Sequence, residues 1–168
     1  MKRAVEPRFL SAGAVEDAVA CMCVEACTRP APGLRSLLER ARSGFPEGPG
    51  RKVLDLCLLN LDTAGETGLP LCQDTGTAVF FAEKGNLVVI SGGTLDDAVH
   101  RGVARGYREG FLRKSLVGCP LERTPLEDNS PAVLHIREVE GDALRLRLLV
   151  KGAGSENGSV ASMLPPLA

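Results

Sequence analysis

The sequence has no tryptophan, one tyrosine and two histidines, and it carries no excess of charge of either sign. Its 20 lysine and arginine residues balance 21 aspartate and glutamate residues, which leaves a formal net charge of −1. Nonspecific binding to nucleic acid depends on a basic surface that releases counterions from the phosphates, and this chain has no surplus of basic residues. We therefore expect no nucleic-acid partner.

Long hydrophobic runs are missing as well. Charged residues interrupt the apolar patch that follows the N-terminal Met-Lys-Arg, which excludes the hydrophobic region of a signal peptide. The longest stretch without charge is the last 12 residues, which are too few and too rich in Gly, Ser and Pro to span a membrane. We expect a cytoplasmic protein with no membrane partner, in which the six cysteines are thiols, core residues or metal ligands more plausibly than disulfides.

A length of 168 residues corresponds to one domain. Folding at this length buries roughly two-thirds of the surface of the unfolded chain, so a core forms without disulfide bonds. We therefore expect residues 1–168 to form a single domain.

Apolar residues recur with helical spacing through the first sixty residues. The pattern predicts helices over 14–27, 34–41 and 53–61, separated by breakers at 28–33 and 44–50 that are rich in Pro and Gly. The N-terminal third of the chain is therefore expected to be helical.

After a loop at 65–70, the residue types change to those typical of strands. Short β-type runs at 78–82 and 87–91 flank Lys-Gly-Asn, and runs at 132–138 and 143–150 flank Glu-Gly-Asp, so each pair predicts a hairpin. Helices first, then strands interrupted by one long helix, favour the α+β class over an alternating βαβ fold. The predicted sheet is antiparallel or mixed.

The long helix is expected to begin at a cap, Thr94 or Asp96, and to reach about Lys114. One of its rows consists of small residues: Ala98, Gly102, Gly106 and Gly110. An interior glycine destabilises a helix by roughly 1 kcal/mol relative to alanine, so this row predicts that a neighbouring backbone or a ligand comes very close. A further face holds Arg101, Arg105 and Arg108, which we interpret as a solvated surface in preference to an anion site.

Most of the cysteines are expected to serve packing. Cys21, Cys23 and Cys27 do not converge on one side of their helix, so core packing is preferred to metal ligation, and Cys57 lies on the apolar stripe of its own helix. For Cys119, in a loop before proline, packing and chemistry remain equally open.

Cys72 differs because it lies in a polar turn, Leu-Pro-Leu-Cys-Gln-Asp-Thr-Gly, just before a predicted strand. A thiolate followed by an amide, a carboxylate and a hydroxyl offers a metal ligand, hydrogen-bonding groups and an acid or base within five residues. Equally open is a turn in which Asp74 and Thr75 only bond nearby amides.

Four segments in register resemble one known family: Leu69–Ala78, Gly106–Ser115, Glu127–Ala132 and Lys151–Asn157. In order and spacing they are similar to the α subunit of iron-sulfur hydro-lyases of the class I fumarase and L-tartrate dehydratase type. The resemblance is specific from Leu69 to Asn157, whereas the N-terminal helices match only in pattern.

The resemblance implies a [4Fe–4S] cluster held by three thiolates, with one iron left open to bind the hydroxyl and carboxylate of a 2-hydroxy acid. Cys72 matches the first ligand. Gln73 and Asp74 match residues that contact substrate, and Asp74 is the candidate for proton transfer. Arg113 matches the arginine that pairs with a substrate carboxylate, although it is also explained as a solvated arginine at a helix C-terminus. Gly154 matches a glycine that contacts substrate.

The chain departs from the family pattern at three positions. Ala153 stands where glycine is usual, Gly158 follows Asn157 in place of lysine or methionine, and Cys119 replaces aspartate. These changes affect the detailed substrate contacts.

By the resemblance, the second cluster cysteine lies beyond the C-terminal end of the chain and the third in a partner. We therefore expect a truncated N-terminal part of an α-type catalytic domain, inactive until a β subunit or C-terminal domain completes it, with the α/β unit forming dimers. Its substrate would be fumarate, malate or L-tartrate. The alternative is a non-catalytic carboxylate-binding or assembly module that keeps the fold without a cluster.

Overall fold

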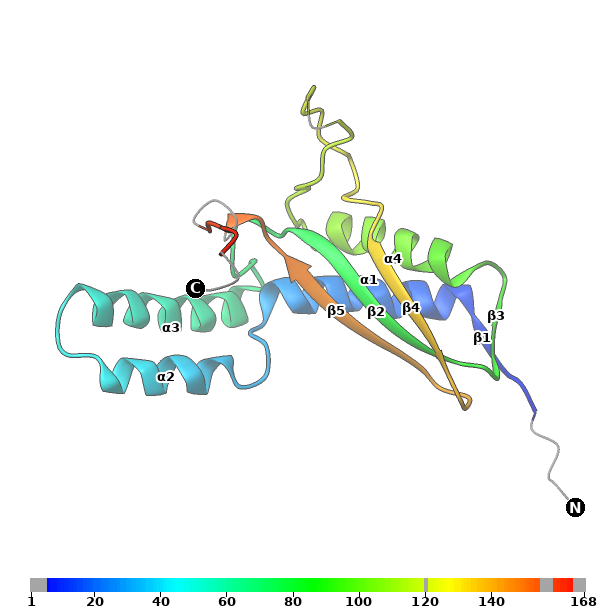
Figure 1. Ribbon diagram of the computed structural model, residues 1–168, viewed down its shortest axis with the longest axis horizontal. Coiled ribbons are helices and arrows are strands. Elements are labelled where there is room, and N and C mark those ends of the chain that lie inside the picture. The colour runs from blue at the N-terminus through cyan, green and yellow to red at the C-terminus, as the bar shows by residue number, and fades with distance from the viewer. Residues whose placement is uncertain (1–5, 120, 155–158, 165–168) are drawn as a thin grey trace, which may run out of the picture.

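The computed structural model describes residues 6–119, 121–154 and 159–164, and within them it contains four helices and five strands (Figure 1). The elements in chain order are β1 (Arg8–Ser11), α1 (Ala12–Thr28), α2 (Leu34–Gly44), α3 (Pro49–Thr67), β2 (Thr77–Gly85), β3 (Val88–Ser91), α4 (Leu95–Glu109), β4 (Val133–Val139) and β5 (Leu144–Lys151). The α+β class is confirmed, and each predicted helix and strand is present, although β1 was not predicted and α4 is shorter than expected. Among the described residues, no helix is both long and apolar enough to cross a bilayer.

The pairing of the strands differs from the two expected hairpins. β2 is the central strand of a three-stranded sheet, parallel to β4 on one edge and antiparallel to β5 on the other, while β3 pairs in parallel with β1. The β4–β5 turn closes over the end of β2, so that a Cβ on Gly85 would lie 2.3 Å from the carbonyl oxygen of Gly141. Because a strand has only two edges, and β4 and β5 occupy both edges of β2, β3 turns away and pairs with the N-terminal segment.

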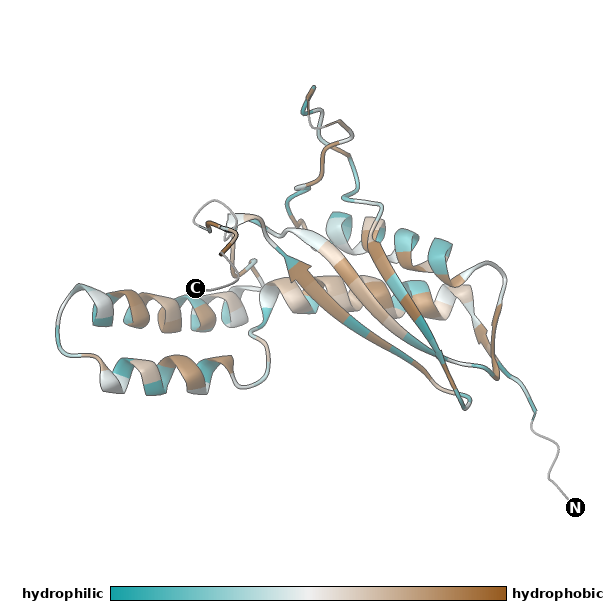
Figure 2. Ribbon diagram, in the orientation of Figure 1, coloured by the Kyte–Doolittle hydropathy of each residue, from teal (hydrophilic) through white to brown (hydrophobic). Residues whose placement is uncertain are grey.

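The hydrophobic core lies between the three-stranded sheet and the helix pair α1 and α4, which covers one face of it (Figure 2). The alternation of β2 turns Ala78, Phe80 and Ala82 toward the helices, where all three are buried. Val19 of α1 and Val103 of α4 are also fully buried in this core. The apolar rows predicted for the two helices therefore meet each other and the sheet.

The glycine row of α4 packs against α1, which confirms the predicted close approach and identifies the neighbour as a backbone. A Cβ on Gly102 would lie 2.6 Å from the Cβ of Val19, and one on Gly106 would lie 2.7 Å from the carbonyl oxygen of Ala20. Glycine is therefore needed at these positions for the two helix axes to come this close.

α4 begins where it was expected but ends earlier. The side chain of Thr94 accepts a hydrogen bond from the backbone N–H of Asp97 at 3.0 Å, as an N-cap does. The helix ends at Glu109, before the expected end near Lys114, because Gly110 caps it and Phe111 takes a left-handed φ of 51°. Arg113 therefore lies in the loop after the helix.

The arginine face of α4 is paired with acidic residues of α1. Arg101 contacts Glu16 at 2.9 Å, and Arg105 contacts Asp17 at 2.6 Å and Glu16 at 3.4 Å. These guanidinium groups lie along the seam between the helices, which leaves them committed to carboxylates of the same chain and argues against an anion site there.

α2 and α3 form a helical hairpin that extends away from the rest of the molecule (Figure 1). Ion pairs join Arg35 to Asp62 and Arg42 to Asp55 across the two helices. Among the residues of α2 none is buried, whereas α3 buries Leu61 and Ala64. The hairpin therefore contributes little to the main core.

The cysteines of α1 divide by burial. Cys23 and Cys27 are buried, which confirms the packing interpretation, and burial raises the pKa of their thiols to about 12 and about 11. Cys21 is exposed, so packing does not explain it, and Cys57 of α3 is half-buried. All six cysteines are free thiols.

The α1–α4 seam gives a direct test. Gly106→Ala inserts a methyl group into the backbone of α1 and should lower the free energy of unfolding by about 1–3 kcal/mol, although alanine is the better helix former. Gly65→Ala is the matched control, because a Cβ there meets nothing within 4 Å in α3, and it should raise stability slightly. Urea unfolding followed by circular dichroism measures both, and equal stability changes of the two variants would contradict the close-packing argument.

Candidate functional site

The candidate site is the loop that links α3 to β2, where Cys72, Gln73 and Asp74 are found. Gly68 ends α3 with a left-handed φ of 69°, and the backbone N–H of Leu71 then donates to the carbonyl oxygen of Cys27 at 2.8 Å. These contacts fix the start of the loop to α1. Cys72 and Gln73 are left exposed at its tip.

Asp74 joins three segments of the chain that are far apart in sequence. Its Oδ1 accepts hydrogen bonds from the backbone N–H of Gly76 at 3.1 Å and from the hydroxyl of Ser115 at 3.2 Å. Its Oδ2 accepts from the backbone N–H of Ala153 at 3.0 Å. Asp74 therefore bonds a nearby backbone amide, as the turn interpretation expected, but its carboxylate also holds the loops after α4 and β5 together.

The electrostatics of the site favour the ionised form of Asp74. Its pKa is lowered chiefly by the hydrogen bond from the Ala153 N–H, with further contributions from Gly76, Ser115 and the positive charge of Arg113. The backbone of Arg113 lies against the loop, because its carbonyl oxygen accepts a hydrogen bond from the hydroxyl of Thr75, and its side chain is exposed. The structure therefore places the segment that carries Arg113 next to the segment that carries Asp74.

The end of the loop is anchored by buried polar side chains that the sequence did not single out as site residues. The hydroxyl of Tyr107, buried in the core, donates to the carbonyl oxygen of Thr75 at 2.6 Å, and the hydroxyl of Thr75 donates to the carbonyl oxygen of Arg113. Being the only tyrosine, on a row of α4 that was predicted to be apolar, Tyr107 was recognisable only as a core residue.

Asn129 is the second buried anchor and is fully inaccessible to solvent. Its Oδ1 accepts from the backbone N–H groups of Ser115 at 2.6 Å and Leu116 at 3.0 Å, while its Nδ2 donates to the carbonyl oxygen of Gly76 at 3.0 Å. It has a left-handed φ of 58°, which asparagine tolerates better than most residues. The only feature of the sequence that pointed to Asn129 as a site residue was its place in the Glu127–Ala132 segment.

The turn after β5 packs directly on this loop. Gly76 has a left-handed φ of 60°, and a Cβ there would lie 2.4 Å from the carbonyl carbon of Lys151, so only glycine allows the two segments to meet. Gly154 lies at the far side of the turn, exposed, with nothing within 4 Å of where a Cβ would be. Residues 155–158 of the same motif lie outside the described residues.

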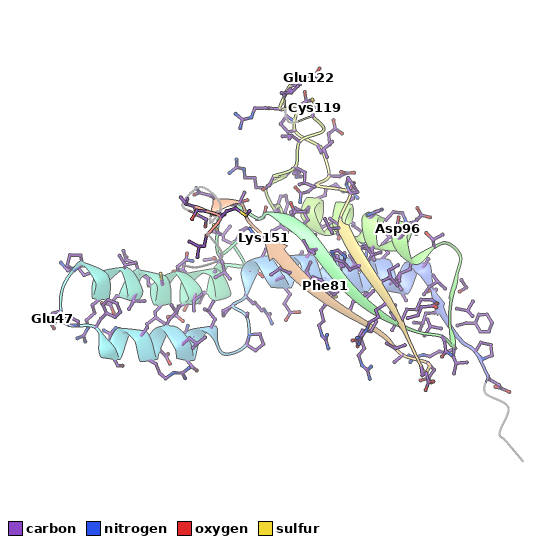
Figure 3. All side chains as sticks on the ribbon, viewed as in Figure 1. Glu47, Phe81, Asp96, Cys119, Glu122 and Lys151 are labelled. Carbon is purple, nitrogen blue, oxygen red and sulfur yellow. The ribbon has the colours of Figure 1, made fainter. Side chains whose placement is uncertain are left out.

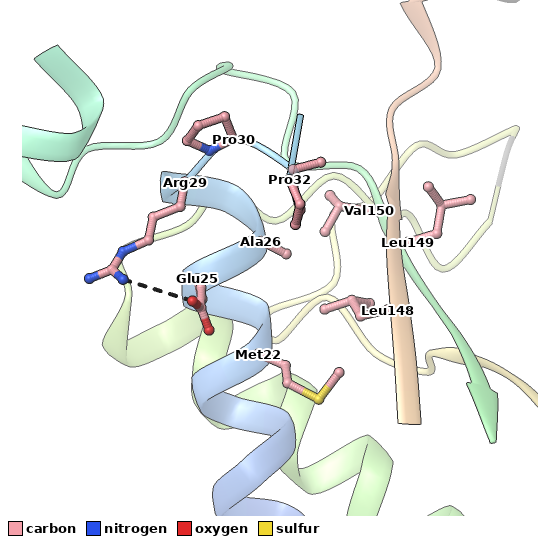
Figure 4. Close-up of a pocket in the computed structure, with 10 residues that line it drawn as sticks. Met22, Glu25, Ala26, Arg29, Pro30, Pro32, Leu148, Leu149 and Val150 are labelled. Atoms are coloured by element: carbon pink, nitrogen blue, oxygen red, sulfur yellow. Dashed lines mark ion pairs between the residues drawn. The ribbon is translucent and has the colours of Figure 1, made fainter. Parts of the chain in front are cut away.

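A small hollow of about 160 Å³ opens beside the loop, lined by Ala26, Cys27, Leu71, Cys72, Asp74, Thr75 and Val150. A second, larger hollow of about 510 Å³ adjoins it and shares the walls Ala26 and Val150 (Figure 4). Figure 4 shows Met22, Leu148 and Val150 turned toward this second space, with the Arg29–Glu25 ion pair, 3.8 Å long, on the helix beside it. The polar groups of the loop thus border an apolar recess.

Cys72 is the thiol best placed for ligation in this loop, because it is exposed and lies beside Asp74. Cys27 lines the same hollow but is buried, with a pKa raised to about 11. Within residues 6–119, 121–154 and 159–164, no group of three or more His, Cys, Asp or Glu residues is arranged to hold a metal ion. The described chain therefore offers one accessible thiol at this place.

Cys119 lies apart from this site, near the tip of the loop that projects between α4 and β4 (Figure 3). Backbone N–H groups of Glu122 and Leu121 lower the pKa of its thiol. Cys119, one of the three positions that depart from the family pattern, is therefore far from Lys151 and the turn that touches Asp74 (Figure 3).

Comparison with known proteins places this chain in a family of hydro-lyases. The model of the family described as fumarate hydratase (fumerase) matches residues 16–168, and the chain belongs to this family. The class I fumarate hydratase, aerobic, of Escherichia coli strain K12 is 39% identical over 103 residues, which are 60% of this chain and 18% of that protein.

Two further relatives come from other organisms. Fumarate hydratase 2 of Leishmania major is 33% identical over 109 residues, covering 64% of this chain and 19% of the relative. A protein named L(+)-tartrate dehydratase subunit alpha, from Methanocaldococcus jannaschii, is 30% identical over 158 residues, covering 90% of this chain and 55% of the relative. The chain thus spans about a fifth to about half of the length of these relatives.

The hydrogen bonds of Asp74 predict a pH-dependent contribution to stability. Because its pKa is lower in the folded state than the ordinary value of about 3.9, its ionised form stabilises the fold above that value, and the contribution is lost as the pH falls through the folded pKa. Asp74→Asn should therefore unfold more easily at neutral pH, by about 1–2 kcal/mol, and the difference from wild type should shrink in acid.

Urea titrations at neutral pH and near pH 3 measure this difference. Glu140→Gln is the control, because it removes an exposed acid from the β4–β5 turn. A difference between Asp74→Asn and wild type that persists unchanged in acid would contradict the assigned role of the ionised carboxylate.

Asn129→Ala should be more harmful than its size suggests. The change leaves two backbone N–H groups and one carbonyl without the partners that the buried amide supplies, so we expect a loss of about 2–4 kcal/mol in the free energy of unfolding. Asn86→Ala, at an exposed asparagine that accepts one hydrogen bond from the Gly141 N–H, should have an effect below about 1 kcal/mol. Thermal or urea unfolding distinguishes the two, and similar losses would remove the special role of Asn129.

Proposed function

We propose that this chain is the N-terminal, α-type part of a hydro-lyase that reversibly adds or eliminates water on a four-carbon dicarboxylate, either fumarate and malate or L-tartrate and oxaloacetate. The observation that carries the proposal is a hollow lined by Cys72 and Asp74, next to the segment that carries Arg113, in a chain that belongs to the fumarate hydratase family. The names of the relatives, fumarate hydratase and tartrate dehydratase subunit alpha, indicate the substrate class.

Arg113 is proposed to bind a carboxylate of the substrate. Its side chain is exposed, its backbone is held against Thr75 of the loop, and its planar fork of N–H groups matches a carboxylate in a bidentate arrangement. Gln73, exposed at the tip of the same loop, is proposed to donate a hydrogen bond to the substrate. Gly154 is proposed to contribute a backbone contact from the turn after β5.

Asp74 is proposed to move the proton on the carbon next to the hydroxyl-bearing carbon. Its lowered pKa keeps it ionised, so it can accept a proton at neutral pH. Both of its oxygens already accept hydrogen bonds, and the one from the Ser115 hydroxyl, at 3.2 Å, is the longest of the three. Rotation of that hydroxyl would release one lone pair of Oδ1, which would still accept from the Gly76 N–H, and Oδ1 is therefore the proposed proton acceptor.

Cys72 is proposed to hold one iron of a [4Fe–4S] cluster. Its exposed thiol beside the polar groups of the loop fits one ligand of such a cluster, and the described residues contain no set of three. When bound, the cluster would supply an open iron as a Lewis acid for the hydroxyl and carboxylate of the substrate. The other ligands are proposed to come from a β subunit or a C-terminal domain, so that the chain alone is inactive.

The complete enzyme is proposed to be a dimer of the α/β unit in the cytoplasm, where free cysteines such as the six in this chain persist. A second candidate function is a carboxylate-binding or assembly module without a cluster. It is supported by the three hydrogen bonds that tie Asp74 to its neighbours, because they account for this residue by structure alone.

Binding of L-malate to the chain, followed by amide chemical shifts in NMR titrations, tests the proposed substrate site. Arg113→Ala should weaken binding by about tenfold, because one charge-assisted contact to a carboxylate is lost. Arg123→Ala, at an exposed arginine of the loop between α4 and β4, is the matched control and should bind as wild type does. An equal effect of both substitutions would remove Arg113 from the site.

Anaerobic reconstitution with iron and sulfide, followed by a fumarate hydration assay, distinguishes the two candidate functions. With its partner, the chain should bind iron and turn over fumarate or tartrate, and Cys72→Ser should lose both properties. Retained malate binding without iron uptake, even with the partner present, would favour the module. Robust turnover by the chain alone would overturn the proposal that the partner supplies ligands.

A further inference from the structure

One long side of the molecule combines an open strand edge with an uncovered apolar surface. In the part of the chain that the structure describes, β5 pairs with β2 along one edge and with no strand along the other. Beside that edge runs a depression that we call the α1–β5 trough, lined by Ala14, Ala18, Met22 and Ala26 of α1 and by Leu144, Leu146, Leu148 and Val150 of β5.

The trough is a real hollow over its whole length. One space of about 300 Å³ lies between Ala14, Ala18 and Leu144, and the space of about 510 Å³ in Figure 4 continues it toward Val150. Met22 lines both, so the two spaces adjoin, and the larger one is also bordered by the Arg29–Glu25 ion pair. The inward side chains of β5 are only half-buried, although they pack against the core on their other side.

The inward side of β5 lacks the protection that open strands often have. Natural edge strands avoid pairing with other chains by carrying charged residues, proline or bulges. The charged side chains of β5 all lie on its outward side, whereas the opposite edge, β4, carries Glu138 on its helix-facing side, paired with Lys84 at 3.3 Å. Within the described residues no other strand pairs with the open edge of residues 144–150, so an added strand could reach both that edge and the apolar row.

The outward face of β5 determines which charge a strand added to its open edge should carry. Arg145 and Arg147 lie on that face and are exposed, and within the described residues the nearest carboxylate to Arg145 is that of Glu83, at 3.9 Å. A strand added to β5 would place the Cβ atoms of its own outward residues about 5 Å from the Cβ atoms of Arg145 and Arg147, within reach of their guanidinium groups. Two copies of this chain, joined edge to edge through β5, would bring like charges together, which disfavours self-pairing.

We propose that the α1–β5 trough binds an extended segment of a second polypeptide as an added β-strand, with apolar side chains in the trough and acidic side chains beside Arg145 and Arg147. The main-chain hydrogen bonds would supply affinity and the alternating side chains would supply specificity. Because Ala26 and Val150 line both the trough and the hollow at Cys72, one end of the bound strand lies beside the candidate site. In so far as this strand belongs to the partner of the hydro-lyase, the inference rests on the proposed function.

A synthetic peptide tests the docking without iron, substrate or partner. The probe is an end-capped, fluorescent peptide of alternating valine and glutamate, matched to the eight residues of β5 and N-methylated along one edge so that it does not self-assemble. The control peptide has lysine in place of every glutamate. Fluorescence anisotropy should show binding of the glutamate peptide that weakens with salt, and at least about tenfold weaker binding of the lysine peptide.

Two variants and one control variant locate the binding surface. Ala18→Arg places a long charged side chain in the trough from the exposed face of α1 and should weaken binding by about tenfold or more, whereas Ala41→Arg, on the exposed surface of α2, should have no effect. Arg147→Glu should reverse the preference, so that the lysine peptide binds more tightly than the glutamate peptide. Circular dichroism checks that all three variants fold.

Several results would overturn the proposal. They are equal binding of the two peptides, wild-type binding by Ala18→Arg, or a trough occupied by a second copy of this chain, seen as a dimer that the peptide does not dissociate and that Ala18→Arg abolishes. Loss of peptide binding with intact malate binding would remove the docking surface and leave the proposed function standing. Peptide binding without malate binding would leave the docking surface standing and remove the proposed substrate site.

Discussion

The close approach of α1 and α4 is the constraint on which the candidate site depends. Gly102 and Gly106 carry no Cβ, so α4 comes close enough for Gly102 to meet the side chain of Val19 and for Gly106 to meet the backbone of Ala20. This spacing sets where the carbonyl oxygen of Cys27 and the hydroxyl of Tyr107 lie, and these two groups hold the start and the end of the loop that carries Cys72. The packing of α1 against α4 therefore fixes the position of a loop that has no regular secondary structure of its own.

The site consists of a loop whose backbone is bound by buried side chains and whose own polar side chains are exposed to solvent. Tyr107 and Asn129 are buried and bind the backbone of the loop, so the loop is fixed through its carbonyl and amide groups. The side chains that face outward, Cys72, Gln73 and Arg113, make no such anchoring contacts and remain available to a ligand. Asp74 belongs to both sets, because its oxygens tie neighbouring loops together while its side chain also lines the hollow beside Cys72.

The same construction explains why the site and the α1–β5 trough belong together. Val150 and Ala26 form the wall between the small hollow at Cys72 and the larger apolar recess (Figure 4). A polypeptide that covered the open edge of β5 would bury apolar surface that the chain leaves half-exposed, and it would at the same time enclose the polar loop. Completing the sheet and completing the site would then be one event, since both share the end of β5.

The sequence by itself determined the α+β class, all helices and strands except β1, the glycine row and the cap at Thr94, because these follow from periodicity and from local backbone chemistry. It did not determine the strand pairing, since the choice between a local hairpin and a parallel partner depends on which edges of β2 the later strands β4 and β5 occupy. Nor did it distinguish Tyr107 and Asn129 as anchors. Their partners are backbone carbonyl and N–H groups up to 53 residues away, which only the folded chain brings within hydrogen-bonding distance.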